Sequence, residues 1–134
     1  SVCWAAEKDA TLTIDAGSVK PIGTALISFH NGNGRKINFD LEASTDKIHW
    51  TSPVSYTSNG TDEFTEFPVN EEARYVRLTG HGADVSTWNS VNEIELYEEM
   101  PDGVVFDTGK IVNVGVEEIT TNGEKKLETL NEDI

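Results

Sequence analysis

Strict alternation of apolar and polar residues is the feature that most constrains this chain. Segment 37–44 places Ile, Phe, Leu and Ala at every second position, which predicts a strand with one buried face. Segments 75–78 and 93–97 repeat the pattern, and no segment shows sustained helical periodicity. Turns rich in Gly, Asn or Asp are expected at 32–34, 45–47, 58–61 and 80–83, and a strand end at 15–17. The sequence therefore predicts an all-β sandwich.

Composition narrows the functional classes. A chain of 134 residues can bury one core, so we expect a single domain, and no segment is apolar for long enough to span a membrane. The formal net charge of −14 argues against nucleic acid and anionic membranes as partners, because both require clustered Lys and Arg. The charge is typical of a protein secreted into a saline habitat, or simply of an acidic solvated surface. The single Cys3 excludes an internal disulfide.

Four phrases occur in order along the chain. They are Phe29–Arg35, Phe39–Trp50, Ala73–Leu78, and a Gly-His-Gly at 80–82 leading to Trp88–Tyr97. Together they resemble the discoidin or coagulation-factor type C fold, and most closely its family 32 carbohydrate-binding modules, including those attached to alginate-type polysaccharide lyases. The resemblance implies a β-sandwich with jelly-roll, galactose-binding-like topology.

The resemblance also implies a function. Such a module is secreted, is not an enzyme, and holds an attached catalytic domain or a cell surface against a polysaccharide. An algal polyuronate such as alginate is the leading ligand, with a galactose-type glycan close behind. The alternative is a structural or adhesion domain of a tandem surface protein. Catalysis is not expected, because the chain contains no Gly-x-Ser-x-Gly, no His-Glu-x-x-His and no phosphate loop.

Two polar loops have the chemistry of a sugar site. Sugars stack a C–H face on an aromatic ring, while amide, guanidinium and imidazole groups hydrogen-bond their hydroxyls. The candidate contacts are His30, Asn33, Arg35, His81, Trp88 and Asn89. Each has a structural alternative: Arg35 could brace its loop, and Trp88 could cover the end of the sandwich.

The two ends of the chain read as one motif when joined tail to head. Family members begin with a strand and a Leu-Asp-Gly-Asp-x-Ser-Thr-x-Trp loop, and segment 130–134 followed by 1–4 resembles that loop, with segment 111–121 as the preceding strand and turn. We therefore expect a circularly permuted single domain over 1–134, with a core at 1–99 and the usual N-terminal strand and loop at 100–134. A tandem array cut out of phase, a strand swapped with a neighbouring molecule, or a disordered tail are the alternatives.

By the same resemblance, the joined loop wraps a structural Ca²⁺ ion. Carboxylate, hydroxyl and carbonyl oxygens are the ligands that calcium prefers. The candidates are Asp133, Asn131, Ser1, Glu93 and the carbonyl of Leu130. Three positions depart from the family pattern, namely Asn131, Glu132 and Val2. An empty, water-filled loop is the alternative.

Overall fold

The computed structural model describes residues 4–29, 34–84, 86, 88–91, 93–98, 110–111, 115–119 and 125–128. Every regular element in these ranges is a β-strand, which confirms the all-β prediction. The strands are β1 (Trp4–Glu7), β2 (Thr11–Ser28), β3 (Ile37–Ser44), β4 (Val54–Thr57), β5 (Thr65–Ala83), β6 (Trp88–Val91), β7 (Glu93–Tyr97), β8 (Lys110–Ile111), β9 (Gly115–Ile119) and β10 (Lys125–Glu128). Within the same ranges, no helix is long and apolar enough to cross a membrane.

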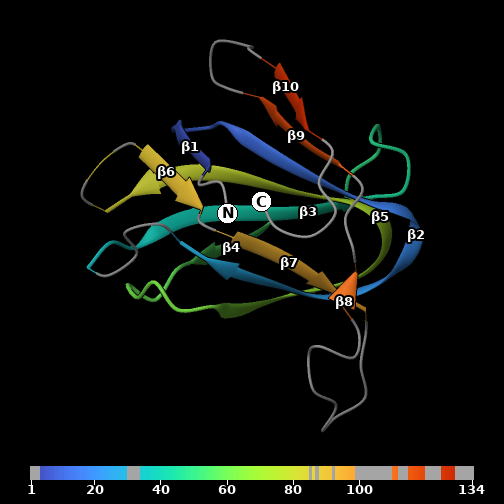
Figure 1. The fold of residues 1–134 in the computed structure, drawn as a ribbon, viewed down its shortest axis with the longest axis horizontal. Coiled ribbons are helices and arrows are strands. Elements are labelled where there is room, and N and C mark those ends of the chain that lie inside the picture. Colours follow the sequence, from blue (N-terminus) through green and yellow to red (C-terminus); the bar gives the residue numbers. More distant parts are fainter. Residues whose placement is uncertain are drawn as a thin grey trace, which may run out of the picture.

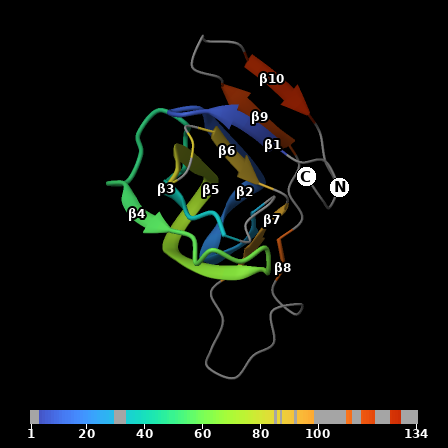
Figure 2. The ribbon, with the colours of Figure 1, turned by 90° about the vertical axis from the view of Figure 1, so that its left-hand side faces the viewer.

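β2 and β5 are long, bent strands that belong to both layers of a sandwich (Figure 1). Residues 11–15 of β2 pair with 75–79 of β5, and beyond the bend residues 20–27 pair with 65–73. One layer therefore runs β10, β9, the first part of β2, the second part of β5, β3 and β4. The other runs from the first part of β5 through the second part of β2 to β7 and β8. Figure 2 views the sandwich from the end opposite the bends.

The bend in β2 lies where a strand end was expected, so that prediction is wrong. The pairing register shifts between Asp15 and Lys20, and the strand then continues. Gly17 has a φ of 90°, a conformation that costs glycine little, and its N–H donates to Asp15 Oδ1 at 2.8 Å. Arg74, at the matching bend of β5, holds the same carboxylate through two bonds of 2.8 and 3.0 Å. The ladder between β2 and β5 is therefore interrupted between Asp15 and Lys20 and resumes beyond the bend.

The core lies between the two layers and confirms the predicted inward positions. The buried residues include Ile37, Phe39, Leu41, Ala43, Val76, Leu78, Ile94 and Leu96. Tyr97, which the alternation places on the opposite face of its strand, is buried as well. An aromatic cluster fills the end away from the bends. The cluster consists of Phe29, Phe39, Tyr56 and Phe67. The centroids of its contacting rings lie 4.9 to 6.3 Å apart, in tilted or edge-on geometry. Apolar burial and these ring contacts stabilise the sandwich.

Strand β9 shows where part of the C-terminal segment lies. It pairs antiparallel with β2, opposing Val116 to Ile14, and Val116 is buried. A strand and its following turn were expected at 111–121, and β9 lies within that segment as part of the sandwich. Ile111 instead belongs to β8 and pairs with Leu96 of β7. Lys47 also reaches β9, through an ion pair of 3.1 Å with Glu117.

β1 and β6 form a separate two-stranded ribbon beside the end of β5. A turn was expected at 80–83, but β5 continues through Ala83, so that prediction is wrong. Gly82 has a φ of 87° inside the strand, which again shows glycine permitting a local distortion rather than ending an element. Backbone bonds from Asp9 N to Gly80 O (2.7 Å) and from Gly80 N to Ala10 O (3.1 Å) join the β1–β2 turn to β5.

Candidate functional site

Several connections meet at the end of the sandwich opposite the bends, on the left in Figure 1. Gly34 N donates to Gly60 O at 2.9 Å, which joins the β2–β3 and β4–β5 connections. Lys36 and Asp84 exchange two bonds, from Asp84 N to Lys36 O (3.0 Å) and from Lys36 N to Asp84 Oδ1 (3.1 Å). We call this region the loop end. Its described residues are 34–36, 58–62, 84, 86 and 88.

Trp88 opens β6 and presents an aromatic ring at the loop end. The residue is 48% exposed, which is high for tryptophan in a folded domain. Its backbone is held on both sides: Trp88 pairs with Glu7 of β1, and its N–H donates to Ser86 Oγ at 3.2 Å. An exposed ring on a backbone held in this way is a surface on which a sugar can stack. The exposure of Trp88 is compatible with the sugar contact predicted for it from the sequence.

Arg35 lies beside Trp88 and is bonded there to neutral acceptors. Its guanidinium donates to Trp88 O and to Ser90 Oγ, both at 3.2 Å. Both acceptors are neutral, and within the described ranges no carboxylate forms an ion pair with Arg35. Arg74 and Arg77, by contrast, are each held by a carboxylate through two bonds. Arg35 therefore braces β6 and retains donors for an anionic ligand.

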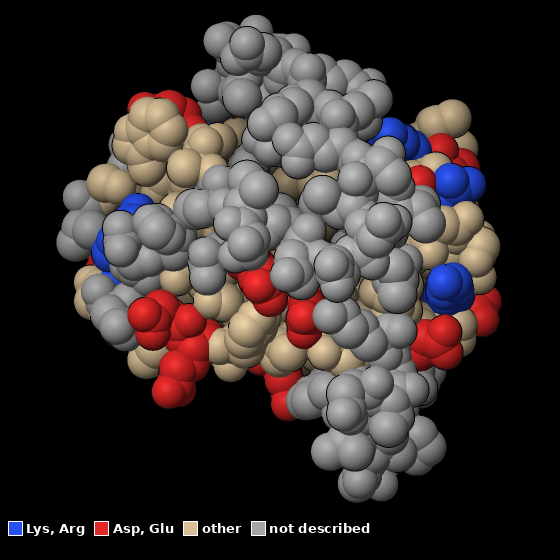
Figure 3. Space-filling view, in the orientation of Figure 1, with Lys and Arg blue, Asp and Glu red and all other residues tan. Residues whose placement is uncertain are grey.

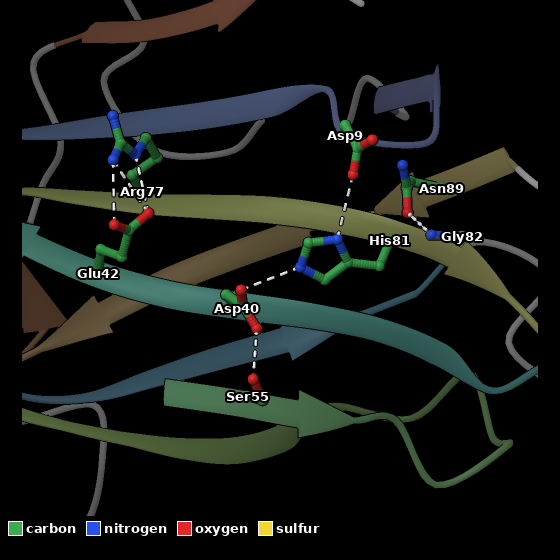
Figure 4. A network of polar contacts seen from close by, with 8 residues as sticks. All are labelled: Asp9, Asp40, Glu42, Ser55, Arg77, His81, Gly82 and Asn89. Atoms are coloured by element: carbon green, nitrogen blue, oxygen red, sulfur yellow. Dashed lines mark hydrogen bonds and ion pairs between the residues drawn. The ribbon is translucent and has the colours of Figure 1, made fainter. Parts of the chain in front are cut away.

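Asn89 does not face solvent, which corrects its assignment as a sugar contact. The residue is 1% exposed. Its amide donates to Ala6 O (3.3 Å) and Glu7 O (3.0 Å) and accepts from Gly82 N (2.7 Å), as Figure 4 shows for the last bond. A buried amide that is hydrogen-bonded to three backbone groups holds strands together and is not available to a ligand.

His81 bridges two carboxylates on the outer face of the sheet (Figure 4). Its Nδ1 lies 3.2 Å from Asp9 Oδ1 and its Nε2 lies 2.9 Å from Asp40 Oδ2. The hydrogen bond with Asp40, helped by Asp9 and opposed by burial, raises the pKa of His81. Burial works to raise the pKa of Asp40, but hydrogen bonds from Ser55 and His81 bring it below its usual value. Both ring nitrogens of His81 are engaged, so neither is free for a sugar hydroxyl.

The same network does not have the order of a catalytic triad. Ser55 Oγ donates to Asp40 Oδ1 at 2.6 Å, and Asp40 lies between the serine and His81. A nucleophilic serine requires the imidazole as its immediate partner, with the carboxylate behind it. The order seen here orients side chains and does not activate a hydroxyl.

The remaining candidates lie largely outside the described residues. These are His30 and Asn33 of the sugar set, and Ser1, Leu130, Asn131 and Asp133 of the calcium set. Glu93 is described: it lies half-buried on β7 and pairs with Ser28 of β2. In the part of the chain that the structure describes, no group of three His, Cys, Asp or Glu side chains could hold a metal ion. The calcium site stays a prediction.

Two features of the site were not predicted from the sequence. They are the clasp, by which we mean the two hydrogen bonds between Lys36 and Asp84, and the hydrogen bond from Trp88 N to Ser86 Oγ. Neither Lys36 nor Asp84 stands in a recognisable motif, because the clasp joins loops 48 residues apart. A weak signal was present: Asp84 and Ser86 are small polar residues just before the exposed tryptophan, where side chains commonly bond to nearby backbone. Trp50, which is not among the candidate sugar contacts, is half-buried, with the Arg77 guanidinium 3.9 Å from its ring centroid.

Comparison with known proteins identifies the family. The family model described as F5/8 type C domain matches residues 1–100, so the chain belongs to the F5/8 type C domain family. This confirms the resemblance to the discoidin or coagulation-factor type C fold. No curated protein matches the chain.

Solved structures of carbohydrate-binding modules are similar to the chain. The structure "CBM32 of AlyQ in complex with 4,5-unsaturated mannuronic acid" is 30% identical, with a TM-score of 0.68 over 73% of this chain and 78% of that one. A pectin-binding carbohydrate-binding module is 25% identical, with a TM-score of 0.62 over 74% and 73%. A truncated AlyQ with CBM32 and alginate lyase domains is 26% identical, with a TM-score of 0.67. That match covers 94% of this chain and 34% of the two-domain chain.

Proposed function

We propose that this chain is a non-catalytic carbohydrate-binding module that binds its ligand at the loop end. The observation that carries the proposal is the exposed side chain of Trp88 beside the guanidinium of Arg35, which forms no ion pair with a described carboxylate. An aromatic face and planar hydrogen-bond donors are the two parts that a sugar site needs. Structural similarity to modules described with mannuronic acid and pectin supports this reading.

We further propose an acidic polysaccharide, of the uronate class found in alginate and pectin, as the ligand. Acidic side chains form several separate patches among the described residues in Figure 3, and the net charge is −14, so long-range repulsion opposes such a ligand. Exposed charges beyond about 8 Å are largely screened at physiological salt, however. The side-chain cations of Arg35 and the neighbouring Lys36, which form no ion pair with a described carboxylate, then supply positive charge at the loop end. A carboxylate on the sugar gains charge-assisted bonds there.

The biological setting follows from the same proposal. The module would be secreted and joined to a catalytic domain, which it would hold against insoluble or gel-like polysaccharide. The similarity to a chain that also contains an alginate lyase domain supports the attachment. Catalysis would reside in that other domain, because the polar network around His81 lacks the order of a nucleophile and its base.

We also keep the permutation and its Ca²⁺ ion as proposals. The support is the tail-to-head match of the sequence and the pairing of β9 with β2. Oxygen donors at Ser1, Leu130, Asn131, Asp133 and Glu93 have the chemistry that calcium prefers. The ion would tie the chain ends together and would contribute stability rather than chemistry.

Calorimetric titration with alginate and galacturonate oligosaccharides, and with neutral galactosides, tests the proposal. A shallow site gives affinities in the millimolar to high-micromolar range, about −4 to −6 kcal/mol. Trp88→Ala should weaken every ligand by roughly 1–3 kcal/mol. Arg35→Ala should weaken uronates more than neutral sugars.

Controls for the titration lie near the opposite end. Ile48→Ala removes a side chain that is 76% exposed in the β3–β4 connection, and Lys20→Ala removes a cation near the bend of β2. Both should leave the affinity unchanged. Absence of any glycan binding would favour the structural or adhesion domain instead, and binding that only the control variants weaken would move the site away from the loop end.

A further inference from the structure

The ribbon that carries Trp88 needs a separate attachment to the sandwich. Among the described strands, β1 and β6 pair with one another and with none of the eight strands that form the two layers of the sandwich. The position of the Trp88 ring relative to the rest of the loop end therefore depends on side-chain and turn contacts. Arg35 supplies such a contact from the β2–β3 connection, through Trp88 O.

Asn89 supplies another contact, and it is fully buried. Its side chain donates to two carbonyls of β1, Ala6 O and Glu7 O, and accepts from Gly82 N of β5 at 2.7 Å. One amide thus joins all three strands β1, β5 and β6. The amide lies directly over Gly80 of β5, where a Cβ would overlap its Cγ, Oδ1 and Nδ2 atoms. Gly80 is required here by close approach, since even one methyl group would displace the amide.

We infer that Asn89 is a positioning residue for ligand binding: its buried amide, seated over Gly80, fixes the β1–β6 ribbon so that Trp88 faces the loop end. The inference rests on the proposed function. Stacking on a ring already held in place avoids the ordering cost that a mobile ring adds to association. Asn89 adjoins Trp88 in sequence but lies inside the protein, so it acts through the ribbon and not through the ligand.

The proposal predicts coupling between Asn89 and Gly80. Gly80→Ala should displace the amide when Asn89 is present and should add little once Asn89→Ala has removed it. The effects of the two changes on Trp88 should therefore be strongly non-additive. Asn38→Ala is the matched control, because Asn38 is an exposed asparagine on β3 whose side chain accepts a hydrogen bond from Thr57 of the edge strand β4, and within the described ranges β3 does not pair with β1 or β6.

The readout is the indole N–H signal of Trp88 in a proton–nitrogen correlation spectrum, assigned with Trp88→Phe. Asn89→Ala and Gly80→Ala should each shift or broaden this signal while that of Trp50, stacked on Arg77, stays in place. Affinity for alginate oligosaccharides should fall about tenfold in both variants, the scale of losing one aromatic contact. Asn38→Ala should change neither signal nor affinity.

Two results would overturn the proposal. One is a folded Asn89→Ala variant, or the milder Asn89→Ser if alanine does not fold, with an unchanged Trp88 signal. The other is loss of the folded spectrum in both Asn89 variants, because Asn89 would then support the whole sandwich rather than the ribbon. The indole signal needs no ligand, so it tests the positioning role even if the wild-type chain binds no sugar and the proposed function fails.

Discussion

Arg77 is expected to contribute more to folding stability than any other described cation, through contacts on the outer face of the sheet. Its guanidinium donates to Glu42 through Nε (3.1 Å) and Nη2 (3.1 Å), as Figure 4 shows, and lies 3.9 Å from the ring centroid of Trp50. The side chains of Arg77 and Glu42 are 28% and 12% exposed. Solvent therefore screens this pair only in part.

The magnitude for Arg77→Met follows from that partial burial. Methionine keeps an apolar stem but leaves Glu42 without its cation. Removing one partner of a fully buried pair costs 3–5 kcal/mol, whereas exposed pairs contribute about 0.2–1 kcal/mol, so about 2 kcal/mol is expected for this intermediate case. Loss of the cation–π contact with Trp50 adds about 1 kcal/mol. The free energy of unfolding should fall by about 3 kcal/mol.

Urea denaturation at pH 7 measures this loss, and a shift of the midpoint by about 1.5 M is expected for a slope near 2 kcal/mol per molar. Arg74→Met is the matched comparison. Arg74 also makes two bonds to a carboxylate and lies over an aromatic ring, but the pair with Asp15 is more exposed, at 38% and 22%, and its ring distance is 5.1 Å. Arg74→Met should cost about half as much. Equal costs, or a smaller cost for Arg77, would refute the reasoning from burial.

Three further predictions concern protonation, the C-terminal segment and the proposed ion. The pKa of His81 is raised in the folded state, so its bonds to Asp9 and Asp40 stabilise the fold fully below about pH 6.5, and this stabilisation is lost as the pH rises through the folded-state pKa. The urea midpoint of the wild type should therefore fall on the alkaline side. His81→Gln should make that fall smaller. A pH-independent difference between the two proteins would contradict this. Val116→Ala should lower the free energy of unfolding by about 2 kcal/mol if β9 is part of the core, and by nothing if the segment is a loose tail. Adding Ca²⁺ after chelation should raise the melting temperature, with most of the increment absent in Glu93→Gln; no shift in the wild type would count against the ion.

The strand faces could be predicted from the sequence because burial has a period of two in a strand. Phe39, Leu41, Val76 and Leu78 are buried as their alternation indicates. The ends of β2 and β5 could not be predicted, because glycine is typical of turns and of distortions within strands alike. Only the pairing of β2 with β5 shows that Gly17 lies at a bend inside a continuing strand.

Part of the candidate site was also predictable. An exposed tryptophan in a polar, glycine-rich context was recognisable as a surface aromatic, and Trp88 and Arg35 do lie together. Asn89 was not recognisable, because a polar residue near a loop normally indicates exposure. Its burial depends on two carbonyls of β1, more than 80 residues earlier in the chain. Contacts between segments so far apart leave no local pattern in the sequence.

The central claim is most directly tested by titrating alginate oligosaccharides into the isotopically labelled chain and following its amide and indole signals. The account predicts progressive shifts confined to the loop end, led by the indole of Trp88 and the amides of Arg35, Lys36 and Asp84, with saturation in the millimolar to high-micromolar range. The bend end, including Tyr75 and Ile48, should not respond. Shifts centred on the bend end, or none with any uronate or galactoside, would contradict the account.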